Sequence, residues 1–128
     1  MNSDIKAYIE KYQKLLPLNN SISFTEAEKR ASMFLDVMAT ITEWRHALSE
    51  GKIKSLSVQN AVYAEELGKC TGSTITGNKV IVEASEAYTA AREEFEMTEN
   101  DLSYLKAYFD IFNNAHIFYR NMAKGENV

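Results

Sequence analysis

Apolar side chains recur with great regularity along the last third of the chain. From Ile81 to Ala123 the positions of this series alternate steps of three and four residues, with Thr98 and His116 as polar members. This spacing places side chains on one face of an α-helix, and the register continues unbroken. The pattern predicts one helix over residues 80–124, which at 1.5 Å per residue is about 65 Å long.

A second long helix is predicted over residues 24–68. Its apolar series steps by threes and fours from Phe24 onward, and Ser23 with Glu26 forms the S-x-x-E pattern of a capping box at its start. Beyond Gly51 the series returns in a shifted phase, at Ile53, Leu56, Tyr63 and Leu67. Gly51 therefore either ends a helix or bends one, and we favour a kinked, nearly continuous helix.

Two shorter segments complete the predicted organisation. Residues 4–16 carry apolar side chains at helical spacing and are followed by Pro17, which disfavours continuation of a helix. Residues 69–79 are rich in Gly and Thr and are expected to form the loop at the tip of a hairpin. We expect one all-α domain over residues 1–128: a long antiparallel helical hairpin, coiled-coil-like, with a short N-terminal helix.

The C-terminal half of the last predicted helix is apolar on more than one face. One arm of a hairpin cannot cover so much aromatic surface, so either the first helix folds back over it or a second subunit does, and we expect both. The candidate residues for contact with an oligomer or a protein partner are Tyr104, Tyr108, Phe109, Phe112, Phe118, Tyr119 and Met122.

Charge and cysteine content narrow the function classes. The chain has a net charge of −4, so it lacks the overall basic field of most nucleic-acid binders. A local basic group at Arg45, Lys52 and Lys54 is the candidate nucleic-acid contact. The single cysteine, Cys70, forms no internal disulfide, and no stretch approaches the roughly 18 apolar residues of a membrane span. A cytoplasmic protein without a membrane partner is expected.

Motifs that could carry catalysis are incomplete. Segment 72–79 approaches a phosphate-binding loop, but Asn78 stands where that loop needs Lys. Glu43 and His46 have the E-x-x-H spacing of di-iron helices, whereas Asn113 replaces the carboxylate in the corresponding pair with His116. His116 is interpreted as a packed or hydrogen-bonded core residue. We therefore expect no enzyme, no metal, no cofactor and no small-molecule substrate.

The order of elements resembles that of the UvsY-type phage recombination mediators. The likeness covers nearly the whole chain: a short N-terminal helix, a linker, a long helix, a Gly-bearing loop and a long C-terminal helix. The residues that carry it most directly are Thr25, Glu26, Ala27, Leu102, Tyr104, Asp110, Ala115 and Arg120.

That resemblance implies a homo-oligomer that binds single-stranded DNA and loads a recombinase, in the cytoplasm of a bacterial host. The broader interpretation, which we favour, is a non-enzymatic and homo-oligomeric assembly or interaction protein that acts through its aromatic C-terminal helix. An inhibitor or scaffold protein of phage or bacterial origin is a further alternative.

Overall fold

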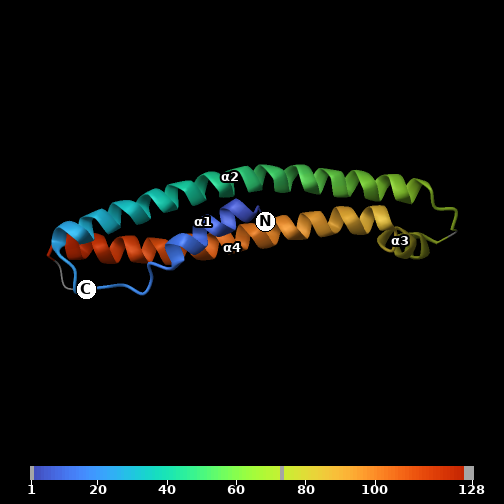
Figure 1. Ribbon diagram of the computed structural model, residues 1–128. Coiled ribbons are helices and arrows are strands. Elements are labelled where there is room, and N and C mark those ends of the chain that lie inside the picture. Colours follow the sequence, from blue (N-terminus) through green and yellow to red (C-terminus); the bar gives the residue numbers. More distant parts are fainter. Residues whose placement is uncertain (1, 73, 126–128) are drawn as a thin grey trace. The chain divides into compact units, whose positions relative to one another are not determined.

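The computed structural model describes residues 2–72 and 74–125, and within them the secondary structure is α-helical. Its four helices are α1 (Ser3–Gln13), α2 (Phe24–Gly68), α3 (Ile75–Glu83) and α4 (Glu86–Ala123) (Figure 1). The chain divides into two compact units. The first unit comprises Met1–His46 with Ser103–Val128, and the second comprises Ala47–Leu102.

Within each unit α2 pairs with α4 in the antiparallel sense. In the first unit Phe34 stacks on Phe112, and the earlier residue Ala31 meets the later residue His116. In the second unit Lys52 contacts Glu99. Tyr63, later in α2, contacts Tyr88, earlier in α4. The expected all-α helical hairpin is thus confirmed.

The starts of α1 and α2 have local causes in the sequence. The side chain of Asn2 accepts a hydrogen bond from the backbone N–H of Asp4 at the start of α1. Helix α1 ends at Gln13, three residues before the expected end. Ser23 Oγ accepts from the N–H of Glu26 at 3.1 Å, as the capping pattern predicts. Helix α2 then runs through Gly51 to Gly68, so Gly51 does not end a helix.

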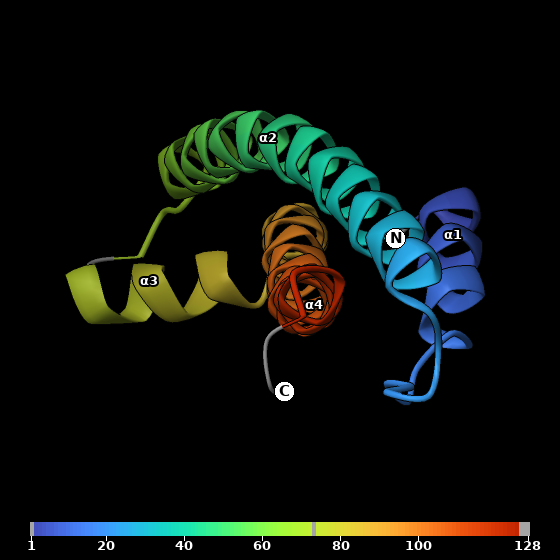
Figure 2. The same ribbon diagram turned by 90° about the vertical axis from the view of Figure 1, so that its left-hand side faces the viewer.

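The segment between the long helices differs from the prediction. The expected loop 69–79 is too long, because Thr74 Oγ1 accepts from the N–H of Gly77 at 3.0 Å and begins α3. The expected unbroken helix 80–124 is also wrong at its start. The chain turns at Ala84, and Ser85 Oγ accepts from Tyr88 N–H at 3.2 Å. Figure 2 shows α3 turned away from the axis of α4. The side chains of Thr74 and Ser85 thus cap the starts of α3 and α4. The apolar spacing did not predict these two caps, and so it did not predict the separate helix α3.

The hydrophobic core lies mainly in the first unit. Phe34 is fully buried and stacks between Phe112 and Tyr119, at ring-centroid distances of 5.7 and 6.0 Å. Helix α1 lies alongside α2 (Figure 1 and Figure 2), where Tyr8 meets Trp44 edge to face at 5.0 Å. The buried residues of this unit are Ile9, Ala27, Ala31, Phe34, Val37, Ile41, Leu105, Phe112, Ala115, Tyr119 and Met122.

Candidate interaction surfaces

The predicted aromatic contact surface on α4 is largely the core of the chain itself. Phe112 and Tyr119 are 0% exposed and Met122 is 6% exposed. These three residues are therefore not available as an open contact surface, because α2 packs over them in the first unit. The four remaining aromatic candidates are half-buried: Tyr104, Tyr108, Phe109 and Phe118.

Tyr104 and Tyr108 form the edge of this core. Their rings lie 4.8 Å apart, and Tyr108 also approaches Phe112 at 5.9 Å. Burial, with smaller contributions from Tyr108 and from Glu10 of α1, raises the pKa of Tyr104 above its ordinary value. These tyrosines therefore belong to the half-buried edge of the first unit's core.

The predicted basic group is divided between the two units. In the first unit the guanidinium of Arg45 lies 5.4 Å from the ring centroid of Phe109. In the second unit Lys52 Nζ lies 3.4 Å from Glu99 Oε2 and 5.6 Å from the ring centroid of Phe95. Lys54 is exposed. Two of the three cations are thus engaged with side chains of α4.

The second unit is also acidic, and its acidic side chains outnumber its basic ones by ten to five. A surface with a net negative charge repels phosphate, although a single lysine attracts it locally. The predicted nucleic-acid contact at Arg45, Lys52 and Lys54 is therefore poorly supported by its surroundings.

Apolar side chains are distributed very differently in the second unit. Its only buried apolar residues among those described are Val82 and Ala91. More than half of the exposed large apolar side chains lie there, although the unit holds less than half of the chain. They are Ile53, Leu56, Val58, Leu67, Ile75, Val80, Ile81 and Met97.

Some polar side-chain atoms of the second unit are also buried. Gln59 of α2 turns toward α4 and donates from Nε2 to the hydroxyl of Tyr88 at 3.3 Å. Among the described residues, three buried side-chain atoms lack a hydrogen-bond partner, and all three lie in the second unit: Gln59 Oε1, Asn78 Oδ1 and Arg92 Nε. Burial of an unpartnered polar atom is unfavourable. Among its described residues, the second unit thus has few buried apolar side chains and three buried polar atoms without a partner, while several large apolar side chains remain exposed.

One row of α2 concentrates this apolar exterior, and we name it the outward stripe. Its members are Ile53, Leu56, Asn60, Tyr63 and Leu67, of which Tyr63 lies at the inner edge, half-buried against Tyr88 of α4. Steps of three, four, three and four residues keep the row on one side of the helix. Ile53 is 69% exposed, and Leu56 and Leu67 are 43% and 40% exposed. Residues 55–64 contain no charged side chain, although charged residues make up 25% of the chain.

The sequence contained the signal for this stripe, in the phase shift after Gly51. The apolar series before Gly51 ends in the buried core of the first unit, where Phe34 and Ile41 are 0% exposed. The series after it points elsewhere on the helix, because α2 continues without a break. Sequence reasoning identified the shift, but it placed the contact surface on α4.

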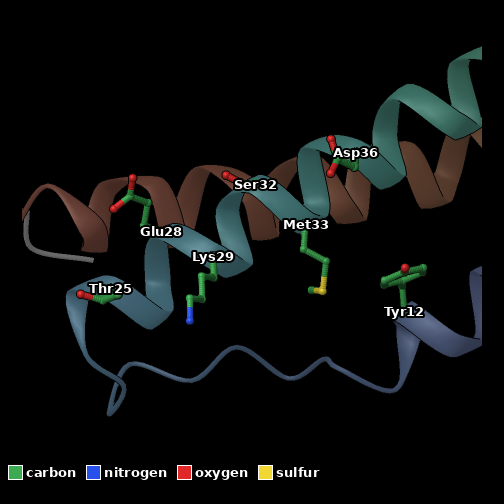
Figure 3. A pocket seen from close by; sticks show the side chains of 7 residues that line it. All are labelled: Tyr12, Thr25, Glu28, Lys29, Ser32, Met33 and Asp36. Carbon is green, nitrogen blue, oxygen red and sulfur yellow. The ribbon is translucent and has the colours of Figure 1, made fainter.

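The first unit has a hollow along α2, lined by Tyr12, Thr25, Glu28, Lys29, Ser32, Met33 and Asp36. Figure 3 shows Lys29 and Met33 pointing from α2 toward the side of the chain on which Tyr12 stands. The charges of this lining are mixed in sign, and it contains no histidine or cysteine. Its residues therefore show no pairing of a nucleophile with a histidine base.

The structure also shows the surroundings of His116, which had been considered as a metal ligand. Nδ1 of His116 lies 2.8 Å from the carbonyl oxygen of Ala31, and so it carries the proton and donates to that oxygen. His116 is thus hydrogen-bonded to α2, as expected, but it is half-buried and lies at the edge of the core rather than within it. Over residues 2–72 and 74–125, no group of three or more His, Cys, Asp or Glu side chains is arranged to hold a metal ion.

The chain matches no known family model, no curated protein and no solved structure in the comparisons. Within the described part of the chain, every helix is too short or too polar to cross a membrane.

Proposed function

We propose that this chain is a non-enzymatic, self-associating interaction protein whose contact surface is the outward stripe of the second unit. The observation that carries the proposal is the exposure of Ile53, Leu56 and Leu67 along one row of α2, whose central residues 55–64 carry no charge. Interfaces between proteins are depleted in charged residues at their centre. The aromatic half of α4 serves a different purpose, because it forms the core of the first unit.

The energetics favour covering the stripe. Full burial of a large aliphatic side chain stabilises a protein by roughly 1.5–3 kcal/mol relative to its exposed state. Ile53, Leu56 and Leu67 are about half exposed, so each gains about 1 kcal/mol on burial in an interface. A helix face with this gain available supports association.

The oligomeric state of matched variants tests the proposal. Leu56→Glu places a charge in the stripe. Val58→Glu places the same charge on the same helix, about 200° around its axis from Leu56, at a residue that is 53% exposed. Light scattering from 1 to 100 µM should show an oligomer for the wild type and for Val58→Glu, and a monomer for Leu56→Glu.

Circular dichroism of each variant controls for loss of helix. A wild-type chain that remains a monomer at 100 µM would overturn the proposal. Equal effects of the two Glu substitutions would also count against it, because they would place the contact outside the stripe.

Recombination mediation, implied by the resemblance, is a separate candidate with less support. Arg45 and Lys52 are engaged with α4, and the surrounding surface is acidic. Binding of labelled single-stranded DNA at 50 and 200 mM salt distinguishes the candidates, because phosphate contacts make affinity fall steeply with salt. We expect no binding at either concentration. Tight binding at 50 mM that is lost at 200 mM would favour the mediator.

An inhibitor or scaffold role would instead require a second protein on the stripe.

A further inference from the structure

We infer that the occupant of the outward stripe is the same stripe of a second copy of this chain, aligned parallel and in register, with Asn60 facing Asn60. This inference rests on the proposed function and specifies its partner. It concerns only the second unit.

The register of the stripe assigns the heptad positions. Steps of three and then four residues make Ile53 an a position and Leu56 a d position. A β-branched residue at a with Leu at d favours two parallel strands over three or four. The stripe continues to Leu67 at a further a position, where it is again exposed.

Asn60 explains why the partner is an identical chain. It is an exposed polar residue at the a position in the middle of an otherwise apolar row. A two-fold axis parallel to the helices places each seam residue against its own copy. The two Asn60 amides then meet, and each supplies a donor and an acceptor to the other. A single Asn at an a position sets register and selects the dimer in this way.

An antiparallel arrangement removes this match. In antiparallel pairs an a residue lies against a d residue of the other helix, which would set Asn60 against Leu56 or Tyr63. The amide would then be buried without an equal partner. Ser57, Gln59 and Ala64 beside the centre of the seam are uncharged, whereas Lys52 and Glu66 at its two ends are charged. Charge therefore does not oppose the parallel arrangement at the centre of the seam.

The size of the contact predicts its strength. From Ile53 to Leu67 the stripe extends about 21 Å along the helix axis at about 1.5 Å per residue. A two-helix contact of that length is at the small end of specific interfaces. The dimer is therefore expected to dissociate on dilution from 100 µM to below about 1 µM.

Disulfide trapping tests the alignment. In a Cys70→Ser background, Leu56→Cys and Leu67→Cys are each oxidised separately at 50 µM. A disulfide requires Cα atoms within roughly 7 Å. Parallel in-register pairing brings each cysteine to its own copy, so each variant alone should become mostly covalent dimer. Val58→Cys, off the stripe, is the matched control and should yield at least tenfold less.

The outcomes separate the two proposals. Covalent dimer only when Leu56→Cys and Leu67→Cys are mixed would show antiparallel pairing and overturn this inference. An oligomer by light scattering without any trapping at these positions would also overturn it, yet leave self-association in place. A wild-type monomer would overturn the proposed function itself.

A second variant does not depend on cysteines. Asn60→Val replaces the polar residue, which fixes the register at a cost in stability, by an apolar one, and so association should become at least tenfold tighter. An unchanged dimer with unchanged affinity would mean that Asn60 lies outside the contact, and would overturn the inference.

Discussion

The hydroxyl of Tyr119 accepts a hydrogen bond from the backbone N–H of Asn19 at 2.9 Å, across 100 residues of sequence. Nη1 of Arg30 donates to the same oxygen at 3.2 Å, and its guanidinium lies 5.5 Å from the ring centroid. One oxygen thus ties the linker after α1 and the first turns of α2 to α4. The contact holds the linker against the core of the first unit.

Tyr119→Phe removes this oxygen and keeps the ring. The free energy of unfolding should fall by about 1 kcal/mol, because two donors lose their acceptor and water at the exposed Asn19 replaces only part of the loss. Urea unfolding followed by circular dichroism measures the change. Tyr12→Phe is the control, because Tyr12 is half-buried and its hydroxyl has no hydrogen bond recorded within the described residues. Equal losses in the two variants would contradict the role assigned to Tyr119.

Phe34 is the centre of the aromatic core in the first unit. It is fully buried between Phe112 and Tyr119, so Phe34→Ala should leave a cavity and lower the free energy of unfolding by about 3–5 kcal/mol. Phe24→Ala, in the same helix at a residue that is 61% exposed, should cost less than about 1 kcal/mol. Thermal and urea unfolding check both values. A small effect at Phe34 would be incompatible with the observed stacking.

The sequence predicted the long helices well, because apolar residues recur in each of them at steps of three and four. The start of α2 at Phe24 and its end at Gly68 agree with the expected range, and the Ser23 cap is observed. Helix α3 was missed because its start depends on one threonine side chain, Thr74. Spacing alone could not show that the apolar register from Ile81 onward belongs to two helices separated at Ala84.

The contact surface could not be read from apolarity alone. Phe112 and Tyr119 were predicted as contact residues because they are large and aromatic, but large aromatic side chains are equally suitable for a hydrophobic core. Which face is covered depends on how the linker and α1 return along α2, and no local pattern encodes that path. The stripe around Leu56 was visible as a change of phase. Its exposure follows only from Gln59 turning toward α4.

Gly51 provides a test of the continuity of α2. A Cβ at this residue would meet nothing within 4 Å. Gly51→Ala should therefore raise the free energy of unfolding by about 0.5–1 kcal/mol, because alanine loses less backbone entropy within a helix. Gly68, the last residue of α2, also has open space around it, and Gly68→Ala should give a smaller gain at this helix end. Chemical denaturation measures both, and a loss of stability in Gly51→Ala would argue for a break there.

Tyr104 makes the stability of the first unit depend on alkaline pH. Burial first, then Tyr108 and Glu10, raise its pKa in the folded chain above the ordinary value near 10. Well below pH 10 the phenol is protonated in both states, and its contribution to stability is fully present. Above it the unfolded chain loses the proton first, so stability falls as pH rises toward the folded pKa.

Tyr104→Phe should therefore flatten the decline in melting temperature between pH 9 and 11, with the wild type as the steeper curve. Glu10→Gln should flatten it less, because burial is the largest cause of the raised pKa and is unchanged in that variant. Absorbance of tyrosinate near 295 nm follows the ionisation directly. If Tyr104→Phe kept the wild-type decline, the alkaline sensitivity would have to come from another group.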